Sequence, residues 1–195
     1  VQPLTRQQQA AIDAGASQSQ APRVRPATYS YDAGDPHQHC ITQVAPLQRG
    51  QATPSISNFQ CFATFSEALA AATGGAVHTA PDFRPDDLTQ EMLSSPTTDT
   101  VLGVDYWDSN FSGSTYSWYT AHTAGCTDGS SYGGNLPSSW NDQISSARGY
   151  AGCNDMIHYE NSNYGGSSRD CHQDWTSCAT MGVMNDHSSS VNLRP

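Results

Sequence analysis

The pattern of hydrophobic and polar positions changes near residue 100. Before that point, residues 61–75 have the periodicity of a helix. The apolar residues of this segment share one helical face: Phe65, Ala68, Leu69 and Ala72. Thr64 and Glu67 have the spacing of a capping box, and Gly74 and Gly75 favour a stop. We therefore expect a helix that buries one face.

The remainder of the first hundred residues is mostly polar and is interrupted by proline. Good helix formers at residues 4–16 and first-turn acids at residues 86–93 predict two further helices. Short strands are expected at 27–31 and 40–44. A polar stretch of this length suggests an extension that wraps a neighbouring domain instead of forming its own core.

From residue 100 onward, short β-branched and aromatic runs alternate with turns rich in Gly, Ser and Asn. Strands are expected at 100–107, 115–120, 146–150, 156–159, 167–171, 178–184 and 190–194. This pattern predicts a sandwich or a barrel. We place a boundary near residue 98, which separates a partly helical, coil-rich N-terminal extension (1–98) from a β domain (99–195).

The β domain contains an internal duplication. Tyr106, Phe111 and Gly113 have the same spacing as three residues that lie 53 positions later: Tyr159, Tyr164 and Gly166. Each set is followed by Asn-Asp-x-x-Ser-Ser, at 141–146 (the first motif) and at 185–190 (the second motif). The motifs are only 44 positions apart, so the first half carries about nine extra residues, expected near 125–135.

This pair of patterns resembles the microbial βγ-crystallin family, over roughly residues 100–195. The resemblance implies a mainly β fold in which two Greek-key motifs pair into a sandwich, with each hairpin glycine in a backbone conformation that other residues avoid. In the extension, residues 61–68 resemble secreted actinobacterial proteins.

The resemblance also implies about two Ca²⁺ ions, bound between the two motifs. Their expected side-chain ligands are Asp142, Ser145, Asp186 and Ser189. Asn141 and Asn185 are expected in the first shell or adjacent to it, and Trp107 and Glu160 are candidates for backbone carbonyl donors. Ca²⁺ takes six to eight oxygen ligands, which fits these residue types. The alternative is that the turns use Asn, Asp and Ser only to bond their own backbone.

Charge and cysteine content narrow the classes of partner. The net charge of −10, with arginine as the only basic residue besides histidine, disfavours nucleic acid and anionic membranes. No apolar run is long enough for a transmembrane helix. Six cysteines without a CxxC spacing indicate disulfides and a secreted, extracellular protein. The simplest partition pairs Cys40 with Cys61 and leaves three possible pairings among the last four: Cys126, Cys153, Cys171 and Cys178.

Other functions were weighed against Ca²⁺ binding. Catalysis is disfavoured because G-x-S-x-G and HExxH are absent. The run His37-Gln38-His39-Cys40 has the composition of a metal cluster, but a surface turn with a disulfide is the simpler interpretation because no second cluster follows. A secreted protease inhibitor or killer-toxin-like protein would use an exposed segment, either the loop at 126–135 or the N-terminal extension. A structural or interaction role at the cell surface would use residues such as Phe59.

Overall fold

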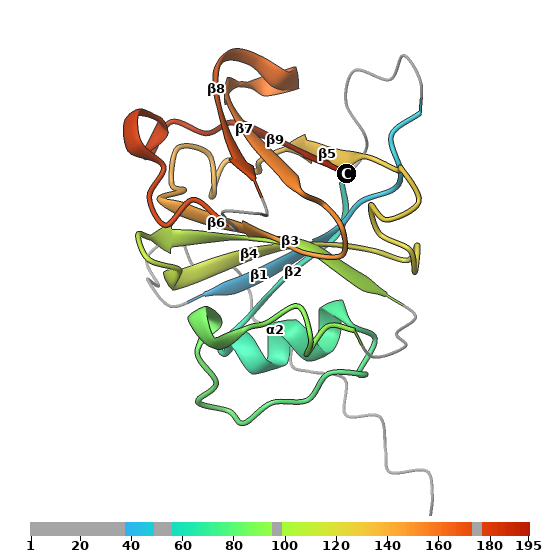
Figure 1. Cartoon of the computed structure of the whole chain (residues 1–195). Helices are drawn as coiled ribbons and strands as arrows, with labels where there is room; N and C mark the ends of the chain where they lie inside the picture. The colour runs from blue at the N-terminus through green and yellow to red at the C-terminus, as the bar shows by residue number, and fades with distance from the viewer. Residues whose placement is uncertain (1–37, 49–55, 95–98, 173–176) are drawn as a thin grey trace, which may run out of the picture.

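The described part of the chain is mainly β, with two stacked sheets and an α-helix that covers the outer face of the first sheet (Figure 1). The structure, a computed structural model, describes residues 38–48, 56–94, 99–172 and 177–195. The elements are β1 His39–Gln43, β2 Ser57–Phe62, α2 Phe65–Ala72, η1 Pro85–Asp87, β3 Thr100–Asp108, β4 Ser112–Thr120, β5 Tyr132–Asn135, β6 Ser146–Gly149, β7 Asp155–Asn161, η2 Ser162–Tyr164, β8 Gly165–His172, η4 Gly182–Met184 and β9 Ser190–Arg194.

The strand order is that of two interlocked Greek keys. Sheet A has the order β2-β1-β4-β3-β6, and sheet B has the order β5-β9-β7-β8. Repeat 1 (residues 100–149) therefore places its third strand, β5, in the sheet of repeat 2 (residues 155–194). In the corresponding position, repeat 2 contributes an isolated β-bridge to sheet A, from Cys178 to Ala147 of β6. The two-Greek-key βγ-crystallin-like sandwich expected from the sequence is confirmed by this pairing.

The extension is built onto sheet A. Strand β1 runs parallel to β4, and β2 forms the outer edge of the sheet. Helix α2 begins at a capping box between Thr64 and Glu67, as expected. Its buried side chains form an outer core with the far face of sheet A, which includes Val104 and Tyr106. The described part of the extension thus packs on the β domain, the arrangement that its polar sequence suggested.

Two predicted elements are wrong. Residues 86–93 form a short 3-10 turn and a loop, because the carbonyls of Asp86 and Leu88 accept bonds from Arg148 and Tyr150 of the β domain instead of from a helical backbone. Residues 178–184 make one β-bridge and then the turn η4, not a strand. The structure adds β2 and β5, which the sequence did not predict. The expected elements at 4–16 and 27–31 lie outside the described residues.

The inner core fills the space between the sheets. It contains Leu102, Trp118, Met156, Leu193 and the six cysteines, among other residues. The disulfides are Cys40–Cys61, Cys126–Cys153 and Cys171–Cys178, so the expected first pair is confirmed and the other two are now assigned.

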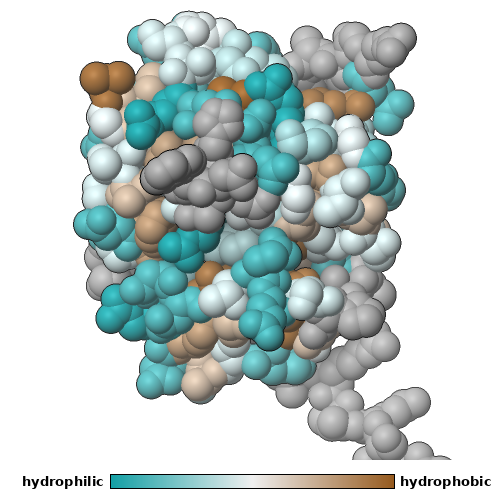
Figure 2. Space-filling view, viewed as in Figure 1, coloured by the Kyte–Doolittle hydropathy of each residue, from teal (hydrophilic) through white to brown (hydrophobic). Residues whose placement is uncertain are grey.

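The surface of the described residues carries few large apolar side chains. Phe59, Trp107 and Val183 are exposed. On the face drawn in Figure 2, strongly hydrophobic residues appear only as small, separate patches among hydrophilic ones. No helix of the described residues is long and apolar enough to cross a membrane.

Candidate functional site

The two hairpins share an unusual backbone that sets up the site. In repeat 1, Asn110, Phe111 and Gly113 have φ of 61°, 62° and 78°. The equivalent residues of repeat 2 have nearly the same angles: Asn163 at 59°, Tyr164 at 62° and Gly166 at 77°. These left-handed conformations fold each hairpin over its own sheet, as the glycine spacing predicted.

The last serine of each motif holds its hairpin in place. Ser146 Oγ donates to the Asp108 carbonyl (2.6 Å) and accepts from the Phe111 N–H (3.0 Å). In repeat 2, Ser190 Oγ makes the same two bonds, to the Asn161 carbonyl (2.7 Å) and from the Tyr164 N–H (3.0 Å). The sixth motif position is therefore a structural anchor, a role that the sequence analysis did not assign.

The two motifs are hydrogen-bonded to one another through their backbones. The Asp142 N–H donates to the Ser188 carbonyl (3.0 Å), and the Asp186 N–H donates to the Ile144 carbonyl (3.1 Å). Asp142 and Asp186 both have positive φ, 59° and 56°. An acid in this left-handed conformation keeps its side chain at the outside of the turn, and both aspartates are exposed.

Each motif is also joined to the hairpin of its own repeat. The Ser145 N–H donates to the Tyr106 carbonyl (3.0 Å), and the Ser189 N–H donates to the Tyr159 carbonyl (2.8 Å). Both serines are buried, at 7% and 9% exposure. The backbone of each motif thus lies beside the hairpin tyrosine of its own repeat, one residue before Trp107 or Glu160.

The side chains of the predicted ligands meet across the two motifs. Ser145 Oγ lies 3.3 Å from Asp186 Oδ1, which joins the fifth position of the first motif to the second position of the second. Within each motif the asparagine amide donates to the neighbouring carboxylate, Asn141 to Asp142 and Asn185 to Asp186, both at 2.7 Å. The asparagine nitrogens therefore orient the aspartates. Among the described residues no equivalent bond joins Ser189 to Asp142.

Among the described residues, Asp142 and Asp186 make no ion pair with a basic side chain. The ion pairs among the described residues involve Asp86, Asp105 and Asp128, and none involves Asp142 or Asp186. No group of three His, Cys, Asp or Glu side chains capable of holding a metal occurs in the described part of the chain. Each motif thus presents one carboxylate that accepts a hydrogen bond from the neighbouring asparagine amide and makes no ion pair among the described residues, a hard oxygen donor of the kind Ca²⁺ prefers.

Trp107 and Glu160 both lie where the strand register shifts, between Tyr106 and Asp108 and between Tyr159 and Asn161. The ring of Trp107 packs edge-on against Trp140, with centroids 5.5 Å apart. The Glu160 carboxylate accepts from the Ser167 N–H (3.0 Å). This bond, helped by the Ser167 hydroxyl and by the charge of His187, lowers the pKa of Glu160.

Two polar groups that sequence reasoning did not single out lie elsewhere. In the inner core, Asp105 Oδ1 is 2.7 Å from His158 Nε2, and Asp105 Oδ2 accepts from Trp118 Nε1 at 2.8 Å. At the surface, His122 lies 3.5 Å from Asp128 and 3.1 Å from the Tyr132 hydroxyl.

The run from His37 to Cys40 does not form a metal cluster in the described residues. His39 Nδ1 lies 3.0 Å from the Thr115 hydroxyl, and Cys40 is in a disulfide. His37 lies outside the described residues.

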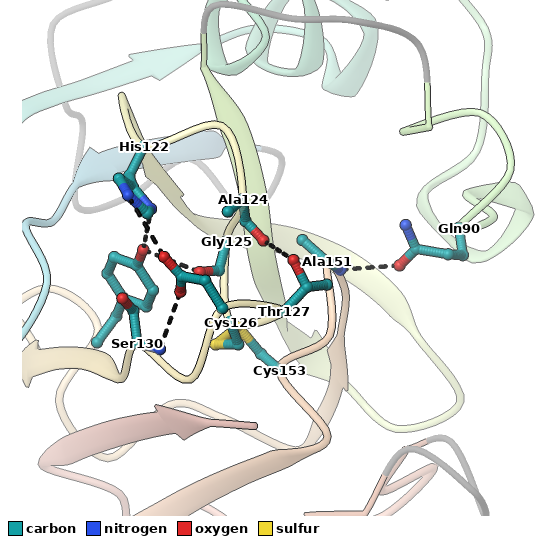
Figure 3. Close-up of a disulfide and its surroundings, with 11 residues drawn as sticks. Gln90, His122, Ala124, Gly125, Cys126, Thr127, Ser130, Ala151 and Cys153 are labelled. Carbon is teal, nitrogen blue, oxygen red and sulfur yellow. Dashed lines mark hydrogen bonds and ion pairs between the residues drawn. A yellow bond between two sulfur atoms is a disulfide. The ribbon is translucent and has the colours of Figure 1, made fainter.

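The loop proposed for an inhibitor is exposed and firmly held. The Cys126–Cys153 disulfide fixes its base, and Thr127 Oγ1 donates to the Ala124 carbonyl at 2.6 Å (Figure 3). Asp128 accepts from the Ser130 N–H at 3.0 Å, and this bond, together with the Ser130 hydroxyl, lowers the pKa of Asp128. Part of the expected insertion is therefore this loop, and its last residues form β5.

Comparison with known proteins gives one structural likeness. No family model and no curated protein matches the sequence. A solved structure described as a βγ-crystallin from an archaeon resembles this chain, with 19% identity and a TM-score of 0.33, over 48% of this chain and 96% of that one.

Proposed function

We propose that this is an extracellular protein that binds about two Ca²⁺ ions between its paired motifs, and that the ions stabilise its fold. The observation that supports the proposal is the meeting of Ser145 Oγ and Asp186 Oδ1 across the motifs, beside carboxylates that make no ion pair in the described part of the chain. A cation placed there would replace a hydroxyl-carboxylate bond with two metal-oxygen contacts.

The pseudo-symmetry of the backbone bonds divides the ligands into two sets. One set combines Asp186, Ser145 and the carbonyl of Trp107, since Ser145 is bonded to the residue before Trp107. The other set combines Asp142, Ser189 and the carbonyl of Glu160, by the same relation. A residue at a β-bulge is left out of regular pairing, so the carbonyls of Trp107 and Glu160 are suited to turn toward an ion.

Each ion would connect three segments that are distant in the sequence: one hairpin, the motif of the same repeat and the motif of the other. Binding would therefore favour the folded chain, and neither motif would bind well alone. With one carboxylate per ion, the affinity should fall in the range of extracellular modules, with Kd on the order of 10⁻⁴–10⁻³ M. The three disulfides agree with an oxidising compartment, where Ca²⁺ is abundant.

The test is thermal unfolding with and without Ca²⁺. At a Ca²⁺ concentration about 100 times Kd, each ion adds about 2.7 kcal/mol to the free energy of unfolding. We expect Asp142→Asn and Asp186→Asn each to lose part of this gain, and the double variant to lose all of it. Asp82→Asn, which changes an exposed acid in the extension, is the matched control and should keep the full gain. A gain of equal size in the double variant would rule out the motifs as the site.

A second candidate function rests on the loop at 126–130. Its exposed tip, held by a disulfide and by local hydrogen bonds, has the rigidity that a protease inhibitor needs. Inhibition assays against a serine protease and a metalloprotease, with Asp128→Ala and Thr127→Ala as variants, would test this function separately from Ca²⁺ binding.

A further inference from the structure

Asp105 and His158 occupy the same position in the two repeats. Each directly precedes the hairpin tyrosine of its strand, and the two are 53 positions apart, which is the spacing of the hairpins themselves. Asp105 lies on β3 of sheet A and His158 on β7 of sheet B. Both are fully buried, and their side chains meet between the sheets at 2.7 Å.

Each polar atom of this pair has a defined role as a hydrogen-bond donor or acceptor. Asp105 Oδ2 accepts from Trp118 Nε1, and Asp105 Oδ1 is the oxygen that faces the imidazole. Since a carboxylate can only accept, His158 Nε2 carries the proton and donates it. His158 Nδ1 is buried and has no hydrogen-bond partner among the described residues. The histidine is therefore held in the inner core by its bond to the aspartate.

Because equivalent positions of the two repeats face each other, the pair is complementary only when unlike repeats pack together. Two copies of repeat 1 would bring carboxylate against carboxylate, and two buried carboxylates this close cannot both ionise. Two copies of repeat 2 would bring imidazole against imidazole, without the carboxylate that accepts from both His158 and Trp118. Burying a polar group without its hydrogen-bond partner is destabilising, so either arrangement is disfavoured.

No disulfide joins repeat 1 directly to repeat 2. Cys126–Cys153 joins the loop after β4 to the connection between the repeats, and Cys171–Cys178 lies within repeat 2. The hydrogen bonds between the motifs, from Asp142 to Ser188 and from Asp186 to Ile144, use backbone atoms. Backbone bonds of this kind would form equally well between two like repeats, so the selection falls to side chains in the core.

We propose that the Asp105–His158 pair determines which repeat packs on which. It directs repeat 1 onto repeat 2 and prevents two copies of the chain from associating through like repeats. The proposal does not depend on Ca²⁺.

The experiment uses the full chain and three variants. His158→Asp carries an acid in both repeats, and Asp105→His carries a histidine in both. The exchanged double variant, Asp105→His with His158→Asp, restores one of each. The single variants are produced alone and then together, in an oxidising compartment and with different affinity tags. Tandem capture followed by light scattering measures the mass of any complex.

We expect each single variant alone to raise the unfolded fraction by roughly 100-fold or more, because it leaves like groups buried together. The exchanged variant restores one acid and one imidazole but deprives Trp118 Nε1 of its carboxylate acceptor, so it should fold as a monomer that is more stable than either single variant and less stable than wild type. The two single variants produced together should form an equimolar complex in which the acid-bearing repeats of one chain pack on the histidine-bearing repeats of the other. Two differently tagged copies of the same single variant are the control and should not be captured together.

Three results would each overturn the proposal. They are single variants that fold as monomers as stable as wild type, an exchanged variant that is no more stable than the single variants, and co-production of the single variants that yields no mixed complex.

Discussion

Substitution of Ser146 by alanine isolates the contact that holds the first hairpin over its sheet. The serine is fully buried, and its hydroxyl makes two bonds, to the Asp108 carbonyl and from the Phe111 N–H. Alanine fits the same space, so the change removes these bonds without adding bulk. Phe111 stands at φ 62°, a conformation that needs support from its surroundings.

The expected cost follows from the two groups left without a partner. A buried donor or acceptor that loses its hydrogen bond costs about 1–3 kcal/mol. Both groups lie in a partly buried position where water can replace some of the loss, so we expect a total of about 2–4 kcal/mol. Ser190→Ala should cost the same in repeat 2, since the Ser190 hydroxyl makes the equivalent bonds.

The assay is urea unfolding with the disulfides intact, followed by tryptophan fluorescence. Ser109→Ala is the matched control, since Ser109 lies in the same hairpin with an exposed side chain, and it should change stability by less than about 0.5 kcal/mol. The slope of the unfolding free energy against urea should not change. If Ser146→Ala is no less stable than Ser109→Ala, the hydroxyl does not hold the hairpin and the reasoning is refuted.

Three further predictions concern the core, the tyrosines and the site. Gly133→Ala should be at least about 2 kcal/mol more destabilising than Gly129→Ala in the same assay. Both glycines have positive φ, but a Cβ at Gly133 would collide with the Val191 carbonyl, whereas one at Gly129 meets nothing. Equal losses of stability would show that only the backbone angle φ matters. Burial raises the pKa of Tyr164 to about 12, whereas the tyrosine of an unfolded chain loses its proton near pH 10. The free energy of unfolding should therefore fall between pH 10 and 12, and this group should have no effect on it below pH 10. Tyrosinate absorbance that rises at pH 10 for every tyrosine would contradict this prediction. Tb³⁺ bound in place of Ca²⁺ should luminesce when tryptophan is excited, by energy transfer from a nearby ring. Trp107 adjoins one of the proposed ligand sets, so Trp107→Phe should lose most of this luminescence. Unchanged luminescence in this variant would place the ion elsewhere.

Local patterns account for the parts of the fold that the sequence predicted. The hairpins were predictable because Gly113 and Gly166 stand at fixed distances from aromatic residues, and β9 was predicted as it is observed, at 190–194. Strand β5 was missed because Tyr132-Gly133-Gly134-Asn135 has the composition of a turn, and its pairing with β9 in the sheet of the other repeat makes it a strand. Strand β2 was missed because its last residues, Cys61 and Phe62, were assigned to the following helix. As for β5, pairing with a distant segment, here β1, makes it a strand.

The sequence predicted part of the geometry around the two motifs, and the residues proposed to bind Ca²⁺ remain a prediction. The spacing of the two motifs indicated which side chains would face each other, and the contact between Ser145 and Asp186 agrees with it. Nothing local pointed to the pair Asp105 and His158, since acids and histidines are common along this chain. The signal was available in the 53-residue register of the duplication, which places the two residues at equivalent positions.

Calorimetric titration with Ca²⁺ tests the central claim most directly. The wild type should bind about two ions, and Asp142→Ala and Asp186→Ala should each lose one of them, while Asp82→Ala should bind like wild type. The double variant should give no binding heat. A wild type that shows neither Ca²⁺ heat nor a Ca²⁺-dependent shift in unfolding temperature would contradict the account, as would full binding by the double variant.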